Sequence, residues 1–255
     1  MHVGVCTISN KEMSVEEVMD VVATTPAAGI EVWGQDHVGS GTTERCADIA
    51  AAAADRGLEI PVYGSYLRAG TDTFDADVDR ELRIAEALGA DAIRVWAGSE
   101  EHQDVSEDHW TAVVEDLTQL GEAAAALDLH VTVERHAGTV TNTTEGAVDL
   151  IDATPANVGL NYQPPFDMPA DDIAADIREL APITTNAHLQ AVQTVGERSR
   201  CPLGFAYFDV ADIVTTLADA DFDGYLEIEF VTDRAPYRAA VAADVAILQA
   251  LLDGS

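Results

Sequence analysis

A short apolar run that recurs along the whole chain is the feature that most constrains its fold. Each run has the length of a β-strand, follows a turn containing Gly, Ala or Asp, and precedes an amphipathic stretch rich in Ala, Leu, Asp and Glu. Eight such runs lie at residues 2–9, 29–35, 58–65, 90–98, 129–138, 158–166, 183–192 and 224–231. Helix-like stretches between them include residues 14–24, 43–56, 75–88, 110–127 and 210–218. This repeated strand–helix unit predicts a parallel α/β fold.

The length of the chain favours one of the two common parallel architectures. A (β/α)₈ TIM barrel takes about 250 residues, and this chain has 255. No linker or low-complexity segment interrupts the series. We therefore predict a single TIM-barrel domain over residues 1–255, with an open doubly wound sheet as the alternative.

Alternation in the last four runs separates a polar face from an apolar one, because successive residues of a strand point to opposite sides. The apolar face carries Val131, Val133, Leu160, Tyr162, Ala187, Leu189, Leu226 and Ile228. The polar face carries Thr132, Glu134, Asn161, Gln163, Asn186, His188, Glu227 and Glu229. Buried charges need partners or ligands, so polar side chains inside a barrel predict a functional site.

Three inward residues have the chemistry of metal ligands. Glu134, His188 and Glu229 lie near the carboxyl ends of their runs, where TIM barrels hold their active sites. Carboxylate oxygen and imidazole nitrogen bind divalent ions such as Mn²⁺, Mg²⁺, Co²⁺ or Zn²⁺. A single buried histidine is more often hydrogen-bonded core, so the prediction of a divalent metal ion depends on the three residues together.

The chain resembles the sugar phosphate isomerase/epimerase family, the xylose isomerase-like TIM barrels. The resemblance lies in the segments IEVWG, ADAIRVWAG, VTVERHAG, VGLNY, NAHLQ, PLGFAYFD and FDGYLEIEF. That family holds its metal with Glu, Asp, His and Glu after strands five to eight, which implies that Glu134, His188 and Glu229 are ligands. Gln163 occupies the Asp position. Its amide oxygen can bind a hard cation, but the site then has one negative charge fewer.

The resemblance also implies a reaction, the isomerisation or epimerisation of a ketose or aldose sugar or sugar derivative. Glu134 and Glu229 would move the proton as an acid/base pair, through a cis-enediolate, while the metal stabilises the charge on oxygen. It further implies that Arg198 or Arg200 binds substrate. Candidates for the walls of the sugar pocket are His136, Trp33, Trp96, His37 and Tyr66. Ordinary barrel packing is an equal alternative for the two tryptophans.

Other charged residues have a structural interpretation. Glu31, Arg94 and Glu227 share the inward face, and we expect an internal ion-pair layer at least as readily as a substrate contact. Arg135 faces the other way, toward a helix or loop. His102 and His109 lie in the polar segment EEHQDVSEDHW, typical of a solvated surface. The three cysteines, Cys6, Cys46 and Cys201, have no CxxC spacing and predict small buried residues.

The formal net charge of −33, with Lys11 as the only lysine, resembles the composition of proteins adapted to a salt-rich cytoplasm. The acidic residues are spread over many segments, and no basic stripe is available to bind a nucleic-acid backbone. The start of the chain has no signal-peptide pattern, and no apolar run has the roughly 18 residues of a membrane span. We therefore expect a cytoplasmic protein whose partner is a small sugar or polyol. Related barrels often form homo-oligomers, and the oligomeric state stays open.

Four alternatives differ in how they fit the sequence. An inosose dehydratase-like lyase acting on a cyclic polyol would use the same metal and bases, and a non-catalytic polyol-binding barrel is compatible with Gln163. A class I aldolase needs a lysine inside the barrel, whereas Lys11 follows the first strand. An endonuclease IV-like activity would need more His and Asp ligands and a basic surface.

The net charge predicts that the fold requires salt. Repulsion among carboxylates weakens as the Debye length falls from about 10 Å at 0.1 M salt to about 3 Å at 1 M. We expect the melting temperature, followed by circular dichroism, to rise steeply as KCl is increased into the molar range. A melting temperature that stays constant between dilute buffer and molar KCl would contradict this prediction.

Overall fold

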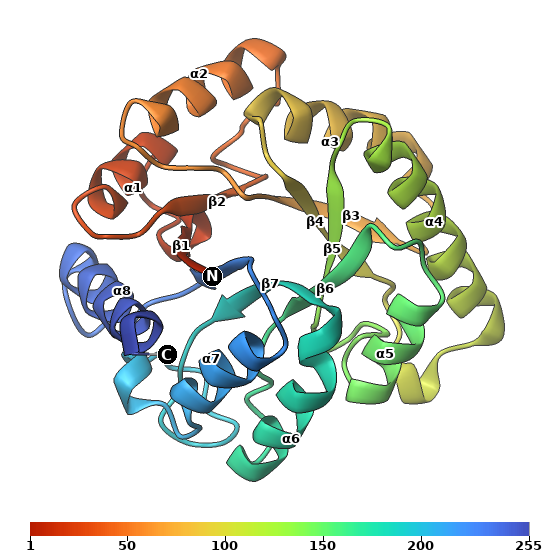
Figure 1. Cartoon of the computed structure of the whole chain (residues 1–255). Coiled ribbons are helices and arrows are strands. Elements are labelled where there is room, and N and C mark those ends of the chain that lie inside the picture. The colour runs from red at the N-terminus through yellow and green to blue at the C-terminus, as the bar shows by residue number, and fades with distance from the viewer. Residues whose placement is uncertain (255) are drawn as a thin grey trace.

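The computed structural model describes residues 1–254, which form a closed parallel barrel surrounded by helices (Figure 1). The strands are β1 (His2–Cys6), β2 (Gly29–Trp33), β3 (Val62–Ala69), β4 (Ala92–Ala97), β5 (His130–Glu134), β6 (Val158–Tyr162), β7 (Thr184–Leu189) and β8 (Tyr225–Ile228). Neighbours in the barrel follow chain order, and β8 closes the ring by pairing with β1, for example Leu226 with Val3. The predicted (β/α)₈ fold is confirmed.

Helices alternate with these strands. They are α1 (Val15–Val22), α2 (Thr43–Ala54), α3 (Phe74–Leu88), α4 (Glu107–Ala125), α5 (Thr144–Asp152), α6 (Ala170–Leu180), α7 (Val210–Asp219) and α8 (Tyr237–Gly254). Short 3₁₀ turns lie at η1 (Thr7–Ser9), η2 (His102–Asp104), η3 (Ala181–Ile183) and η4 (Leu203–Phe205). Several helices begin where a hydroxyl or carboxylate caps a backbone N–H of the first turn, and the capping residues are Ser14, Thr42, Ser106, Thr143 and Asp209.

The third strand begins later than the sequence pattern predicts. The apolar run at 58–65 includes Pro61, which has no N–H to donate to a sheet. In the part of this run before Pro61, the described structure has only an isolated β-bridge, between Glu59 and Gly29. Continuous strand pairing starts at Val62. The strand then runs to Ala69. The prediction for this strand was therefore about four residues too early.

The two faces predicted for the last four strands are confirmed. The eight apolar residues of these strands are buried, and all belong to the main core cluster shared with the helices. The polar face makes contacts inside the barrel: Asn186 Nδ2 donates to Asn161 Oδ1 at 3.0 Å and to Glu227 Oε2 at 2.8 Å. Arg135 faces the helices as expected, and its Nη2 lies 2.8 Å from Asp176 Oδ1 on α6.

A buried carboxylate on α8 links stability to pH. Asp244 is 1% exposed, and its Oδ1 accepts a hydrogen bond from Leu203 N at 2.8 Å. Burial raises the pKa of Asp244 to about 6, although this hydrogen bond opposes the rise. The unfolded chain should titrate near the ordinary pKa of about 3.9. Because the folded state holds the proton more tightly, the contribution of Asp244 is complete below the unfolded pKa and is lost as pH rises through about 6.

Replacing Asp244 by Asn should therefore stabilise the protein at neutral pH. The amide keeps an acceptor for Leu203 N and never ionises, so we expect the free energy of unfolding at pH 7 to rise by on the order of 1–3 kcal/mol. Thermal melts across the pH range in constant molar KCl would measure the effect, with exposed Asp253→Asn as a control of equal charge change. A destabilised Asp244→Asn variant at pH 7 would show that the burial of this charge costs nothing.

Candidate metal centre

The four residues expected to hold a metal lie at the carboxyl ends of consecutive strands. Glu134 ends β5, Gln163 follows β6, His188 is the last residue but one of β7, and Glu229 follows β8. The potential ligand atoms of Glu134, His188 and Glu229 all lie within 4.8 Å of one another. The fold therefore brings the three strongest sequence candidates into one cluster.

Glu134 is oriented by two donors from β4. Its Oε2 accepts hydrogen bonds from Arg94 Nη1 at 2.6 Å and from Trp96 Nε1 at 2.5 Å, and Glu134 is 3% exposed. Among residues 1–254 no hydrogen-bond donor reaches the other carboxylate oxygen, Oε1. Glu134 thus has one oxygen fixed by the barrel and one that can bind a ligand.

Glu229 is held from the neighbouring strand. Its Oε2 accepts a hydrogen bond from Gln190 Nε2 at 2.5 Å, and Gln190 Oε1 in turn accepts one from Arg200 Nε. Burial and the charge of Glu134 outweigh the attraction of the nearby cations, and they raise the pKa of Glu229 to about 7. A carboxyl group with this pKa can both take up and release a proton near neutral pH.

His188 is fixed by a carboxylate on one side and free on the other. Its Nε2 lies 2.7 Å from Glu31 Oε2, whereas Nδ1 is buried and has no hydrogen-bond partner in the described chain. Burial lowers the pKa of His188, but the charges of Glu31 and the other nearby carboxylates raise it to about 9 overall. A carboxylate on one ring nitrogen is the arrangement that orients metal-binding histidines, with the other nitrogen as ligand.

Gln163 presents a buried acceptor that the protein does not satisfy. Its Oε1 has no hydrogen-bond partner within residues 1–254. An unpaired buried carbonyl costs free energy of about 1–3 kcal/mol, which a bound cation would offset. Two carboxylates, a free imidazole nitrogen and an unpaired amide oxygen together fit a divalent ion.

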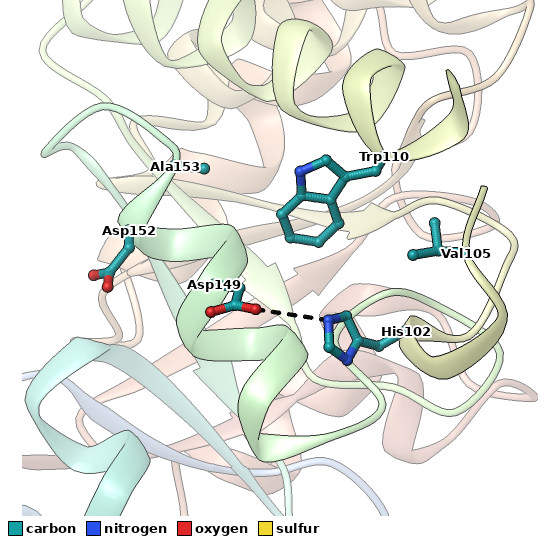
Figure 2. A pocket seen from close by; sticks show the side chains of 6 residues that line it. All are labelled: His102, Val105, Trp110, Asp149, Asp152 and Ala153. Carbon is teal, nitrogen blue, oxygen red and sulfur yellow. Dashed lines mark ion pairs between the residues drawn. The ribbon is translucent and has the colours of Figure 1, made fainter. Parts of the chain in front are cut away.

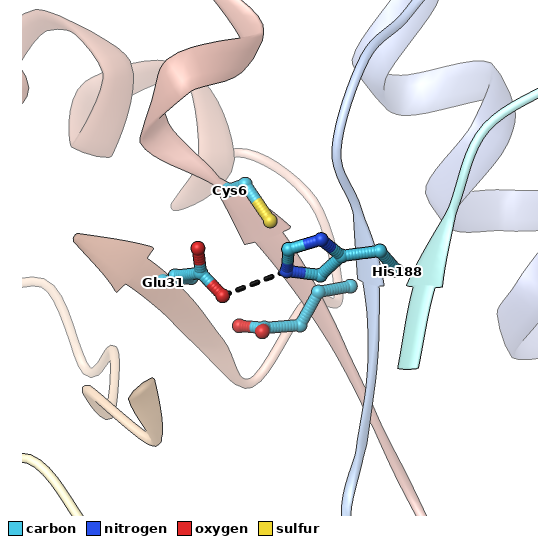
Figure 3. Close-up of side chains that lie close together, drawn as sticks. Cys6, Glu31 and His188 are labelled. Atoms are coloured by element: carbon cyan, nitrogen blue, oxygen red, sulfur yellow. Dashed lines mark hydrogen bonds and ion pairs between the residues drawn. The ribbon is translucent and has the colours of Figure 1, made fainter. Parts of the chain in front are cut away.

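A second cluster lies deeper in the barrel and shares His188 (Figure 3). It contains Cys6, Glu31 and Glu227, whose potential ligand atoms also lie within 4.8 Å of one another and of the histidine. Burial opposes ionisation of Glu31, but His188 and Arg94 lower its pKa to about 2. Burial and the charge of Glu31 raise the pKa of Glu227.

The internal ion-pair layer expected from the sequence is therefore present in a modified form. Arg94 Nε lies 3.2 Å from Glu31 Oε1, but Glu227 accepts a hydrogen bond from Asn186 instead of pairing with arginine. Gly64 on β3 makes room for the pair, because a Cβ at this position would lie 2.9 Å from Arg94 Nη2 and still closer to Glu31 Oε1. Sequence reasoning missed Cys6 and the contact between Glu31 and His188. The only signal for Cys6 was its position beside Glu31 in the paired strands β1 and β2.

Aromatic residues line the mouth of the barrel. Trp33 Nε1 donates to Tyr66 Oη at 2.9 Å, Tyr66 lies 5.5 Å from Trp96 between ring centroids, and Trp96 stacks on His136 at 5.2 Å. His37 makes an edge contact with Trp33 at 5.2 Å. The structure thus brings together all five residues that the sequence suggested as walls of the sugar pocket.

The two arginine candidates differ in position. Arg200 reaches Gln190 beside Glu229, whereas the Arg198 side chain is exposed and only its backbone oxygen takes part, accepting from Arg200 Nη1 at 2.8 Å. Arg200 is therefore the arginine that the fold brings to the candidate site.

The histidines expected at a solvated surface have defined contacts. His102 lines an outer pocket between η2, α4 and α5, together with Trp110, and its Nε2 lies 3.7 Å from Asp149 Oδ2 (Figure 2). His109 Nε2 accepts a hydrogen bond from Ser99 N at 3.0 Å. Both side chains are partly exposed.

The sequence of residues 19–251 matches the family model described as xylose isomerase-like TIM barrel. The chain belongs to this family. Among proteins of curated function, none matches it by sequence. Within residues 1–254, no helix is both long and apolar enough to cross a membrane.

Several solved structures share the fold of this family member. A probable 3-DHS dehydratase, AsbF, from Bacillus anthracis aligns over 98% of this chain and 99% of its own, with a TM-score of 0.82 and 20% identity. The IOLI protein with a zinc atom aligns over 100% and 99%, with a TM-score of 0.84 and 14% identity. A D-allulose 3-epimerase from Methylomonas sp. aligns over 98% of each chain, with a TM-score of 0.80 and 13% identity. The neighbours thus include an epimerase, a dehydratase and a zinc-containing structure.

The unpaired oxygen of Gln163 generates a prediction about metal affinity. Gln163→Asp should place a charged oxygen beside the cation, and we expect Mn²⁺ to bind about 10- to 100-fold more tightly. Gln163→Glu keeps the side-chain length, so a comparison of the two variants tests whether the shorter Asp side chain can reach the cation. Calorimetric titration in molar KCl would measure both variants, and Gln103→Asp at the surface controls for the added charge. Weaker or unchanged binding in both variants, with the fold preserved, would mean that Gln163 is not a ligand.

Proposed function

We propose that this chain is a metal-dependent isomerase or epimerase that acts on a ketose or aldose sugar, or on a sugar derivative. The observation that carries the proposal is the cluster of Glu134, His188 and Glu229, whose ligand atoms lie within 4.8 Å of one another at the carboxyl ends of the strands. A divalent ion held there by these residues and Gln163 would supply Lewis acidity to the carbonyl oxygen of the substrate.

The two carboxylates would move the proton. A proton beside a carbonyl group leaves only when a base takes it and the charge on oxygen is stabilised, and a second group must return it to the neighbouring carbon or to the opposite face. Glu229 would serve as one of these two groups, because its carboxylate lies in the same cluster as Glu134 and His188. Arg94 and Trp96 hold Glu134 in a fixed orientation, which favours proton transfer along one direction.

The surrounding residues would position the substrate and limit the access of water. Trp33, Tyr66, Trp96 and His136 form a continuous aromatic wall, and such rings suit the apolar faces of a sugar. Arg200, through Gln190, keeps Glu229 oriented. The epimerase among the structural neighbours supports this assignment at the level of the fold.

A lyase is the second candidate. One carboxylate would remove a proton beside a carbonyl, and a protonated carboxyl group of the same pair would donate a proton to the departing hydroxyl group. The probable dehydratase among the structural neighbours has the same fold. Incubation of a panel of ketoses and a cyclic inosose with Mn²⁺ in D₂O separates the candidates by NMR. An isomerase or epimerase yields a deuterated isomer, and a lyase yields a dehydrated product.

Removal of either carboxylate should abolish turnover. We expect Glu134→Gln and Glu229→Gln to lower kcat by well over about 100-fold on the substrate that the panel identifies, because each group is proposed both to bind metal and to move a proton. Circular dichroism in molar KCl would check the fold, and exposed Glu145→Gln is the control of equal charge change. Near wild-type activity in either variant would refute the acid/base assignment.

A further inference from the structure

Several cations of this acid-rich chain have no acidic partner. The sequence contains 13 Lys and Arg against 46 Asp and Glu. Within the described part of the chain, the Lys and Arg side chains without an ion pair are Lys11, Arg68, Arg83, Arg198, Arg200 and Arg238. With so many carboxylates available, an unpaired and partly buried cation calls for an explanation.

Three of these cations lie over aromatic rings at the mouth of the barrel. Arg68 lies 4.2 Å from the centroid of Trp96. Lys11 Nζ lies 5.4 Å from the centroid of Trp33 and 5.9 Å from that of Phe230, and Arg200 lies 5.4 Å from the same Phe230 ring. We call Lys11, Arg68 and Arg200 the cation rim.

The cation rim borders one continuous surface. Lys11 and Arg200 share the Phe230 ring, and Phe230 packs against the cluster that contains Trp33. Trp33 is joined through Tyr66 to Trp96, the ring under Arg68. Trp96 also donates a hydrogen bond to Glu134, and Arg200 is joined through Gln190 to Glu229, so the cation rim borders the candidate metal centre.

The carboxylates of the site have other cationic partners besides the rim. Arg94 already pairs with Glu31 and Glu134, and His188 lies against Glu31 as well. A bound divalent ion would add further positive charge beside Glu229. The rim thus adds three positive charges beside the site in a protein whose net charge is −33, and positive charge at a binding site attracts anions.

The arginines of the rim also keep hydrogen-bond donors free. Arg68 donates from Nη1 to Gly98 O at 2.6 Å, and Arg200 donates to Gln190 and to Arg198 O. Among residues 1–254 no acceptor is bound to Nη2 of either arginine. Burial lowers the pKa of both guanidinium groups, so an anion that contacted them would relieve the cost of holding these charges away from water.

We propose that the candidate site takes a sugar-like substrate with an anionic terminal group, a carboxylate or a phosphate, which Lys11, Arg68 and Arg200 bind. The inference rests on the proposed function only for the location of the substrate, and it narrows the substrate class of that site. The aromatic wall would contact the carbon chain while the cation rim binds the charged end.

Three probes that share a six-carbon polyol chain test the proposal: sorbitol, D-gluconate and sorbitol 6-phosphate, of which each anion differs from sorbitol in one terminal group. Calorimetric titration of the Mn²⁺-loaded protein in constant molar KCl should show at least one anion binding about 10-fold more tightly than sorbitol. This corresponds to a difference of about 1.4 kcal/mol in binding free energy. The anion with the higher affinity identifies the terminal group as carboxylate or phosphate. Because binding is measured, the result does not depend on whether the protein is an isomerase.

Charge-removing variants assign the preference to the rim. Lys11→Gln and Arg68→Gln should each weaken binding of the preferred anion several-fold while leaving sorbitol unaffected. Arg83→Gln, an unpaired exposed arginine on α3, is the matched control and should change neither. Equal affinity for all three probes, including no measurable binding, would overturn the proposal. So would a preference for the anion that persists undiminished in both rim variants, because it would then come from the metal.

Discussion

The charged chain that crosses the barrel interior is the interaction on which the site depends. Glu31 on β2 contacts both Arg94 on β4 and His188 on β7, and Arg94 continues to Glu134 on β5. All four residues are at most 4% exposed. Each charge would be costly in isolation, and removal of one would leave the others unpaired, which typically costs about 3–5 kcal/mol. Gly64 leaves the space that this network occupies.

The same network prepares the candidate metal centre. Contact with Glu31 on one nitrogen directs the free nitrogen of His188 away from that carboxylate, and the donors on Glu134 fix one of its oxygens. Glu229 is held separately through Gln190. The ligands are therefore oriented by the protein before a cation binds, which lowers the reorganisation that binding requires.

Three cations without acidic partners lie beside the candidate site of a strongly acidic chain. The chain as a whole is strongly acidic, yet the mouth of the barrel carries Lys11, Arg68 and Arg200 without acidic partners in the described structure. These three cations contact aromatic rings, whereas most other cations of the chain pair with carboxylates. A cation over a ring keeps its charge available to a ligand. The acidic residues of the chain and the cation rim are therefore separate features with separate physical roles.

The sequence by itself determined the repeated strand–helix units, the barrel, and the inward face that carries Glu134, His188 and Glu229. These follow from alternation and periodicity, which are local properties of the chain. Only the tertiary structure decided that Glu31 contacts His188 and that Arg200 approaches the site. Glu31 and His188 are 157 residues apart, and their contact depends on barrel closure and strand register, which no local pattern encodes.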